Sequence, residues 1–158
     1  MVFRNAEEYE SEAIMNLYRA AVGKPFCTWD ETYPGMFEIW GDLSNRTLFV
    51  LEEEKELIGA ISIVPDNELD HFEHWEINKN AREFARVVLR PDHQHQGLSV
   101  FLVEGIIQEM KKQHVAAIHI AVAKENIPAL KLYKRTGFCI RGEADLFGHH
   151  FCLCEKIL

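Results

Sequence analysis

A turn that could bind a phosphate group follows the apolar run at residues 87–89. Pro91 comes shortly after this run and ends hydrogen-bond donation to a neighbouring strand, and a helical apolar pattern begins after Gly97. The first N–H groups of a helix have no carbonyl partners, and the positive end of the helix dipole attracts anions. Gly97 lets phosphate oxygens approach the main chain, and the small Ser99 keeps the helix close. Residues 94–99 therefore predict a pyrophosphate-binding turn between a strand and a helix.

A second candidate segment is a short helix that carries a tyrosine. Asn126 suits the N-cap position, Pro128 suits the first turn, and Gly137 suits the position just after the last turn. Asn126 and Tyr133 are almost two turns apart, so they project from nearly the same side, together with Leu130. The Tyr133 phenol could donate a proton to a ligand lying across this helix, or it could be a core aromatic on an apolar stripe.

The two segments together resemble the two signatures of the GNAT family of N-acetyltransferases. Gln94-x-x-Gly97-x-Ser99 is similar to the acyl-CoA signature Q/R-x-x-G-x-G/A, with Ser99 as the one departure. Residues 126–138 resemble the second signature, N-x-x-A-x-x-x-Y-x-x-x-G-F. The resemblance implies that Tyr133 protonates the departing CoA thiolate and that Asn126 binds the pantetheine arm, caps its helix, or does both. It also implies that acetyl-CoA is the cosubstrate and is bound by Leu89, Gln94, His95, Gln96, Gly97, Leu98, Ser99 and Asn126.

Length and composition agree with one enzyme domain. The 158 residues are 47% hydrophobic and 27% charged, which is typical of a globular protein, so a single domain over residues 1–158 is expected. The formal net charge of −8 argues against nucleic acid as a partner. No signal peptide and no apolar run long enough for a membrane span is recognisable, which predicts a cytoplasmic protein without a membrane partner. The oligomeric state is left open, with a homodimer as one alternative.

The cysteines and histidines do not form a recognisable metal or disulfide pattern. Cys152 and Cys154 are close in sequence but point to one face of a strand, so reduced, mostly buried thiols are expected. The histidines do not show the spacing of a persuasive zinc site. The sequence therefore predicts no bound metal.

The order of apolar segments predicts an α/β fold. Strands are expected at residues 2–4, 47–52, 57–64, 81–89, 117–122, 138–145 and 150–157. Helices are expected at residues 7–22, around residues 36–43, from about residue 97 through Lys112, and at residues 126–136. This alternation favours a central mixed sheet flanked by helices. The family resemblance implies the acyl-CoA N-acyltransferase fold, a mixed and mostly antiparallel sheet with splayed fourth and fifth strands and about four helices.

Acyl transfer from a thioester to an amine also needs a base and a group that stabilises the oxyanion. The resemblance implies that the oxyanion is bound by a backbone N–H on the strand before the turn, and Leu89 is the chosen position. Glu83 has the same parity as Leu89, so in an unbroken strand both point to one face. Glu83 is therefore a candidate base, with a solvated strand residue as the equal alternative. Its candidate relay partners, among which the sequence does not decide, are His71, His74 and His119.

The sequence indicates the acceptor less clearly than the cosubstrate. Trp29 and Tyr33 fall where this fold builds its acceptor pocket and could pack around an amine, or they could hold helices to the sheet. The acidic net charge favours a cationic acceptor. An acceptor that bears a carboxylate remains an alternative, because arginines recur on the strand face opposite Glu83 at Arg82, Arg86 and Arg90.

We therefore predict direct transfer of an acetyl group from acetyl-CoA to the primary amine of a small molecule or peptide, in a ternary complex. Two other functions remain open, a non-catalytic CoA-binding or sensory module and a protein-interaction domain.

Overall fold

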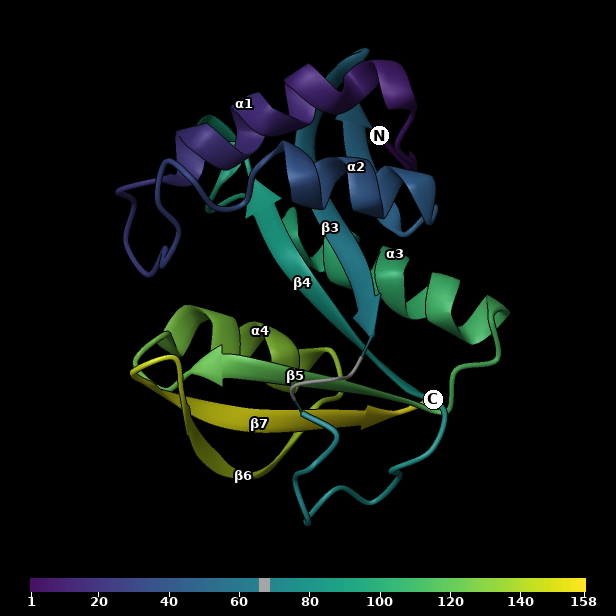
Figure 1. Cartoon of the computed structure of the whole chain (residues 1–158), viewed down its shortest axis with the longest axis vertical. Helices are drawn as coiled ribbons and strands as arrows, with labels where there is room; N and C mark the ends of the chain where they lie inside the picture. The colour runs from purple at the N-terminus through teal and green to yellow at the C-terminus, as the bar shows by residue number, and fades with distance from the viewer. Residues whose placement is uncertain (66–68) are drawn as a thin grey trace. The chain divides into compact units, whose positions relative to one another are not determined.

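The computed structural model describes residues 1–65 and 69–158 and contains a seven-stranded sheet with helices (Figure 1). The strands are β1 (Val2–Asn5), β2 (Leu48–Glu53), β3 (Glu56–Pro65), β4 (Ala81–Leu89), β5 (Ala117–Ala123), β6 (Cys139–Leu146) and β7 (His149–Ile157). The α-helices are α1 (Ser11–Ala21), α2 (Met36–Ser44), α3 (Ser99–Lys112) and α4 (Ile127–Arg135), and the short 3-10 turns are η1 (Glu8–Glu10) and η2 (Pro91–His93).

The hydrogen-bonded order of the strands is β1-β2-β3-β4-β5-β7-β6. The pairs β1–β2, β2–β3, β5–β7 and β6–β7 are antiparallel, whereas β4 and β5 are parallel. The parallel register pairs Ala81 with Ala117 and Arg82 with Ile118, at the start of both strands. The predicted mixed, mostly antiparallel sheet with flanking helices is confirmed.

Contacts between residues divide the chain into two compact units, each described by itself. The first unit contains Met1–Ile63 and Ala85–Ile106, and the second contains Val64–Phe84 and Ile107–Leu158. Strand β4 and helix α3 each contribute residues to both units. The single domain expected over residues 1–158 stays a prediction.

In the first unit, helices α1 and α2 lie side by side (Figure 1). Ile14, Leu17 and Tyr18 recur at helical spacing along α1 and are buried in its core. The β2–β3 hairpin closes through Glu54 and Lys55, which have positive φ of 50° and 67°. Two successive residues of positive φ match the twist of the flanking strands, and this explains the tight turn.

In the second unit, β7 pairs with the whole length of β5 on one side and with β6 on the other. The β6–β7 hairpin turns through Phe147 and Gly148, again with two positive φ values.

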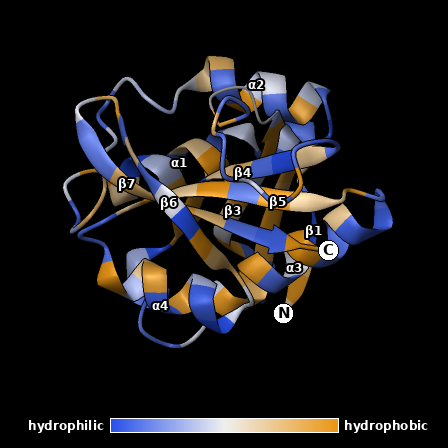
Figure 2. Ribbon diagram, turned by 90° about the horizontal axis from the view of Figure 1, so that it is seen from below, coloured by the Kyte–Doolittle hydropathy of each residue, from blue (hydrophilic) through white to orange (hydrophobic). Residues whose placement is uncertain are grey.

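Hydrophobic and hydrophilic residues alternate along the helices of both units, as α2 of the first unit and α4 of the second show in Figure 2. Such alternation is expected of helices that bury one face.

A buried carboxylate fastens the segment before β4 to the strands of the second unit. Glu155 of β7 is 1% exposed and accepts hydrogen bonds from the backbone N–H groups of Glu76 and Ile77, both at 3.0 Å. It also accepts from Arg141 Nε at 2.8 Å and is bonded to His119 Nε2 at 2.9 Å. These partners hold the pKa of Glu155 below its usual value even though burial acts in the opposite direction.

We expect Glu155→Gln to lower the free energy of unfolding by about 3–5 kcal/mol, because it leaves a buried set of donors without their charge partner. Since the folded pKa is depressed, the contribution of Glu155 is complete above its unfolded pKa of about 4.3 and is lost as pH falls through the folded pKa. Urea unfolding from pH 7 to pH 3 therefore should show the difference between wild type and variant shrinking at low pH. Glu143→Gln is the matched control, because its exposed pair with Lys124 should contribute at most about 1 kcal/mol. A pH-independent difference would contradict this account.

Within residues 1–65 and 69–158, no helix is long and apolar enough to cross a membrane. All four cysteines are free thiols. Cys152 and Cys154 are buried, whereas Cys27 is half-buried and Cys139 is exposed, so the expectation of mostly buried thiols was right for only two of them. The predicted cytoplasmic location stays a prediction.

Candidate active site

The predicted pyrophosphate turn lies in the first unit, between β4 and α3. Turn η2 begins at Pro91, and α3 begins at Ser99. Between them His95 and Gly97 have positive φ of 63° and 75°. Turns that contain left-handed residues can bring successive N–H groups to one concave side, which is a common anion-binding geometry.

These N–H groups are available to a ligand. No hydrogen bond to the described parts of the chain, residues 1–65 and 69–158, is donated by the backbone N–H groups of His95, Gln96, Gly97, Leu98 and Ser99. The prediction for Gln94 was wrong in one respect, because its N–H donates to the Pro91 carbonyl at 3.3 Å. The Gln94 side chain bonds the carbonyl of Leu89 at 3.3 Å and so ties the turn to the end of β4.

Glycine at position 97 is favoured by the backbone conformation and not by a lack of space for a side chain. A Cβ at this position would meet no atom within 4 Å, but its φ of 75° is unfavourable for residues with a side chain. A side chain here would therefore project into open space beside the turn. This arrangement leaves the main chain of the turn accessible to phosphate oxygens.

Helix α4 of the second unit begins as the sequence predicts. Asn126 is its N-cap, and its Oδ1 accepts a hydrogen bond from the Ala129 N–H at 3.2 Å. Pro128 lies in the first turn, and Gly137 follows the helix with a positive φ of 98°. The capping role of Asn126 is thus confirmed, while its role toward pantetheine stays a prediction.

Tyr133 of α4 lies in an aromatic cluster, as the core alternative predicts, while its role as a proton donor stays a prediction. Its ring packs against Phe84 and Phe138 with centroid distances of 5.7 Å in each case, so it belongs to an aromatic cluster. No hydrogen bond of its hydroxyl to the described residues is found. Burial, with a smaller contribution from the nearby Cys154 thiol, raises the pKa of Tyr133 to about 12. The phenol is therefore a protonated, unengaged donor at neutral pH.

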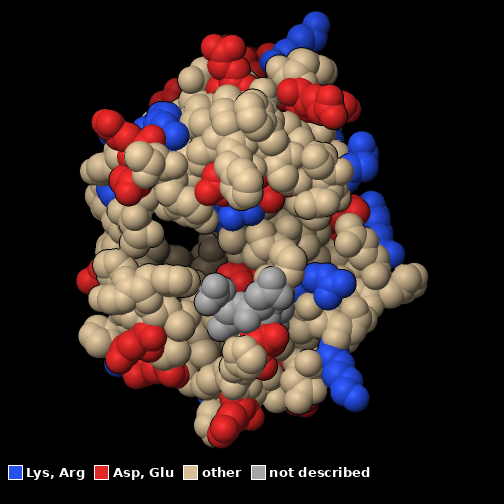
Figure 3. All heavy atoms as spheres, in the orientation of Figure 1, with Lys and Arg blue, Asp and Glu red and all other residues tan. Residues whose placement is uncertain are grey.

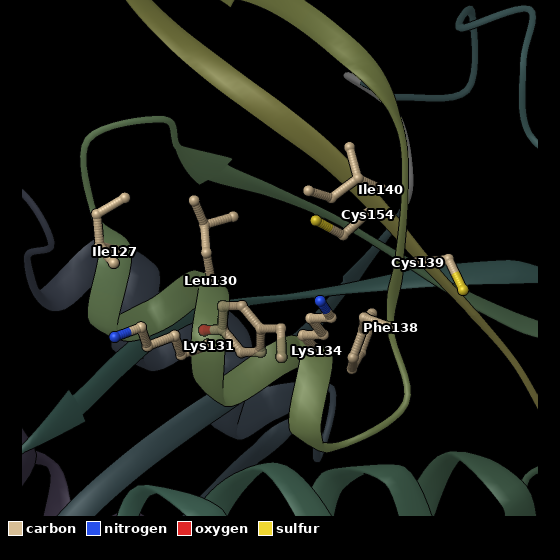
Figure 4. A pocket seen from close by; sticks show the side chains of 9 residues that line it. Ile127, Leu130, Lys131, Lys134, Phe138, Cys139, Ile140 and Cys154 are labelled. Atoms are coloured by element: carbon tan, nitrogen blue, oxygen red, sulfur yellow. The ribbon is translucent and has the colours of Figure 1, made fainter.

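A pocket of about 410 Å³ borders Tyr133 within the second unit. Figure 4 shows Ile127 and Leu130 of α4 on one side of it and Ile140 and Cys154 of the strands on the other. Burial raises the pKa of the Cys154 thiol to about 11, so this group is not a thiolate at neutral pH. The pocket is lined mostly by apolar side chains, which is consistent with the burial that raises the pKa of Tyr133 further above neutral pH.

The strand that carries Glu83 is not regular. Glu83 is half-buried in β4, but Arg86 of the same strand has a positive φ of 52°. A left-handed residue departs from the extended conformation of a strand, so the alternation of side chains does not have to continue across it. The placement of Glu83 and Leu89 on one face assumed an unbroken strand and stays a prediction. Leu89 ends β4 as a buried residue.

The three candidate relay histidines differ sharply. His71 and His74 are exposed, whereas His119 of β5 is 1% exposed and bonded to Glu155. The indole of Trp75 stacks on the His119 ring at a centroid distance of 3.8 Å. Within residues 1–65 and 69–158, no cluster of at least three His, Cys, Asp or Glu residues could hold a metal ion.

The aromatic residues predicted to face an acceptor lie in the first unit. Trp29 packs edge-on against Tyr18 at 5.4 Å, and the Tyr33 hydroxyl lies 3.4 Å from Arg86 Nη1. Trp40 of α2 is 63% exposed.

Sequence reasoning missed a buried ion pair at this place. Asp42 of α2 forms a salt bridge with Arg86 at 2.8 Å and accepts from Ser62 Oγ at 2.8 Å. A signal existed, because Asp42 follows Ile39 on the apolar face of α2, and a carboxylate on such a face needs a buried partner. Arg90 is also paired, with Asp92 and Glu56.

Comparison with known proteins identifies the family. A model of the acetyltransferase (GNAT) family matches residues 11–138. The L-methionine sulfoximine/L-methionine sulfone acetyltransferase of Pseudomonas aeruginosa is 24% identical over 94% of this chain and 86% of its own length. The ribosomal-protein-alanine N-acetyltransferase of Brucella melitensis has a similar fold, with a TM-score of 0.80, 22% identity and complete coverage of both chains. The Salmonella typhimurium protein yncA, solved with its cofactor acetyl-CoA, has a TM-score of 0.79 and 20% identity over 100% of this chain and 94% of that one.

The pyrophosphate turn and the capped α4 helix lie inside the matched region, at the positions of the two sequence signatures. The chain therefore belongs to the acetyltransferase (GNAT) family and is an acetyl-CoA-dependent N-acetyltransferase.

Proposed function

We propose that this protein transfers the acetyl group of acetyl-CoA directly to the primary amine of a small molecule or peptide, in a ternary complex. The observation that carries the proposal is the run of five N–H groups at residues 95–99 without acceptors in the described chain. They suit the pyrophosphate of CoA, because backbone donors at a helix start bind anions without a basic side chain. Relatives named for an amino acid analogue and for a ribosomal protein both fit amine acceptors.

The residues at β4 and α4 supply the remaining chemistry of the proposed reaction. The neutral amine attacks the thioester carbonyl, the C–S bond breaks, and the Tyr133 hydroxyl gives its proton to the departing thiolate. The backbone N–H of Leu89 binds the oxyanion. Glu83 takes the proton that the ammonium group loses, directly or through water.

His119 is the histidine best suited to assist Glu83. The parallel register pairs Arg82 with Ile118, and one step further along both strands leads to Glu83 and His119. Residues at matching positions of neighbouring strands share a face of the sheet. The bond from His119 to Glu155 fixes its ring, so we assign His119 a positioning role.

The test is an acceptor screen with acetyl-CoA. Amino acids, peptides with free N-termini and polyamines are incubated separately with the protein, and each acceptor is analysed by mass spectrometry for an added acetyl group. The proposal expects enzyme-dependent acetylation of at least one amine. Binding of acetyl-CoA without any acetylation would favour the non-catalytic sensory module.

The Glu83→Gln variant tests whether the Glu83 carboxylate acts as the base. We expect turnover to fall about 10²-fold near neutral pH and to recover partly as pH approaches the pKa of the acceptor amine, because a neutral amine needs no base. The measurement is the pH profile of kcat for both proteins, with Glu143→Gln as a carboxylate control. A wild-type rate and profile would remove Glu83 from the mechanism.

A further inference from the structure

Arg86 holds an unusual backbone conformation at the centre of a polar cluster in the first unit. Its φ of 52° is unfavourable for a residue with a side chain, so the surrounding contacts must compensate. Arg86 Nε and Nη2 donate to the two oxygens of Asp42 at 3.0 and 2.9 Å. This pairing uses one edge of the guanidinium and fixes the direction of the other.

The free edge of Arg86 meets a second donor. Tyr33 is 43% exposed, and its oxygen is 3.4 Å from Arg86 Nη1, which is long for a hydrogen bond. No acceptor for the Tyr33 hydroxyl proton is found within residues 1–65 and 69–158. A guanidinium N–H and a phenol O–H therefore converge on one place without an acceptor of matching strength.

The loop that carries Tyr33 is ordered by its own hydrogen bonds. Asp30 Oδ1 accepts from the backbone N–H groups of Thr32 and Tyr33 at 2.7 and 2.9 Å. Arg19 of α1 donates to the Pro34 carbonyl at 2.9 Å, and Trp29 packs on Tyr18. Tyr33 is thus positioned before any ligand binds, which lowers the entropy cost of binding.

Asp42 does not offer a site for a cation. Both of its oxygens accept from Arg86, one also accepts from Ser62, and its side chain is 11% exposed. The Arg86 side chain is 13% exposed and Tyr33 is 43% exposed, so the donors that remain are an N–H of Arg86 and the hydroxyl of Tyr33. Such donors match an anionic oxygen, and a planar carboxylate fits the flat edge of an arginine.

We propose that Arg86 and Tyr33 form a carboxylate subsite, so that the preferred acceptor is a small amine that also carries a carboxylate, such as an α-amino acid. This inference rests on the proposed N-acetyltransferase function and names its substrate class. Arg86 and Tyr33 bind the acceptor carboxylate, and Asp42 is a positioning residue that holds Arg86.

The test compares each amino acid with its own carboxamide. L-leucine and L-leucinamide, L-phenylalanine and L-phenylalaninamide, and spermidine are acetylated separately, and kcat and KM are measured for each. The amine of a carboxamide is less basic and so more reactive at neutral pH, which means that a preference for the acid has to come from binding. We expect kcat/KM to favour each acid over its amide by about tenfold or more.

Three variants locate the preference. Tyr33→Phe keeps the ring and should reduce the preference about three- to tenfold through KM of the acid, with the amide unchanged. Arg86→Gln should abolish the preference, and Asp42→Asn with Arg86→Gln repeats that test without an unpaired buried carboxylate. Arg82→Gln, on an exposed residue of the same strand, is the control and should keep the wild-type preference.

Equal use of acids and amides, a preference for spermidine, or a preference that survives in Tyr33→Phe and both Arg86 variants would overturn the subsite. If the amides are still acetylated when one of these results is found, the proposed transferase function remains supported. If none of the supplied amines is acetylated, the proposed function itself is rejected.

Discussion

A Tyr133→Phe variant is expected to bind acetyl-CoA as the wild type does and to transfer acetyl groups about 10²- to 10⁴-fold more slowly. The ring contacts with Phe84 and Phe138 remain, so the fold should be intact. The deleted hydroxyl is a donor whose pKa of about 12 keeps it protonated at neutral pH. The loss should shrink at higher pH, because a thiol of pKa about 8.5 can then leave without an acid. Steady-state kcat from pH 6.5 to pH 9.5 measures the loss of turnover and its dependence on pH. Titrations with acetyl-CoA measure whether binding is unchanged.

Tyr9→Phe is the matched control for this variant. Tyr9 is 82% exposed on η1, so its hydroxyl should contribute nothing to turnover. Full activity of Tyr133→Phe at neutral pH would mean that water or another group protonates the sulfur. Tyr133 would then be a core aromatic only.

Gly97→Glu should abolish the binding of acetyl-CoA while the protein remains folded. The carboxylate would project beside the N–H groups of residues 95–99 and repel the pyrophosphate. For the wild type, acetyl-CoA at a hundred times its Kd should stabilise the fold by about 2.7 kcal/mol, and the variant should lose this gain. Thermal unfolding with and without acetyl-CoA measures the effect.

Gly148→Glu controls for the cost of placing a side chain at positive φ. Gly148 has a φ of 77° and, like Gly97, open space where a Cβ would be. Both variants should therefore lose similar stability without ligand, and only Gly97→Glu should lose the response to acetyl-CoA. Equal responses in the two variants would remove the turn from the binding site.

The parts of the fold that sequence predicts well are those determined by neighbouring residues. Helix α4 is an example, because its cap at Asn126 and its end before Gly137 are written within one short segment. The turn at residues 94–99 is another, since Pro91 precedes it and Gly97 lies within it. In each case the local backbone conformation follows from residue types that are adjacent in the chain.

The parts that sequence missed depend on partners far along the chain. Nothing in the residues around Arg86 indicates its positive φ or its ion-pair partner Asp42, which is 44 residues away. The choice of His119 among the three candidate relay histidines likewise depends on its bond to Glu155, which is 36 residues away. A glutamate in the apolar β7 run was the available signal for such a buried cluster.

The most direct test of the account follows the acetyl carbon itself. Acetyl-CoA labelled with ¹³C at the carbonyl is mixed with the protein and an acceptor from the amine screen, and the label is followed by NMR. We predict that the thioester resonance is replaced by an amide resonance on the acceptor, with one free CoA thiol formed for each amide. Persistence of the thioester signal, in a sample where acetyl-CoA is shown to be bound and every amine class has been supplied, would contradict the claim that this protein transfers acetyl groups to amines.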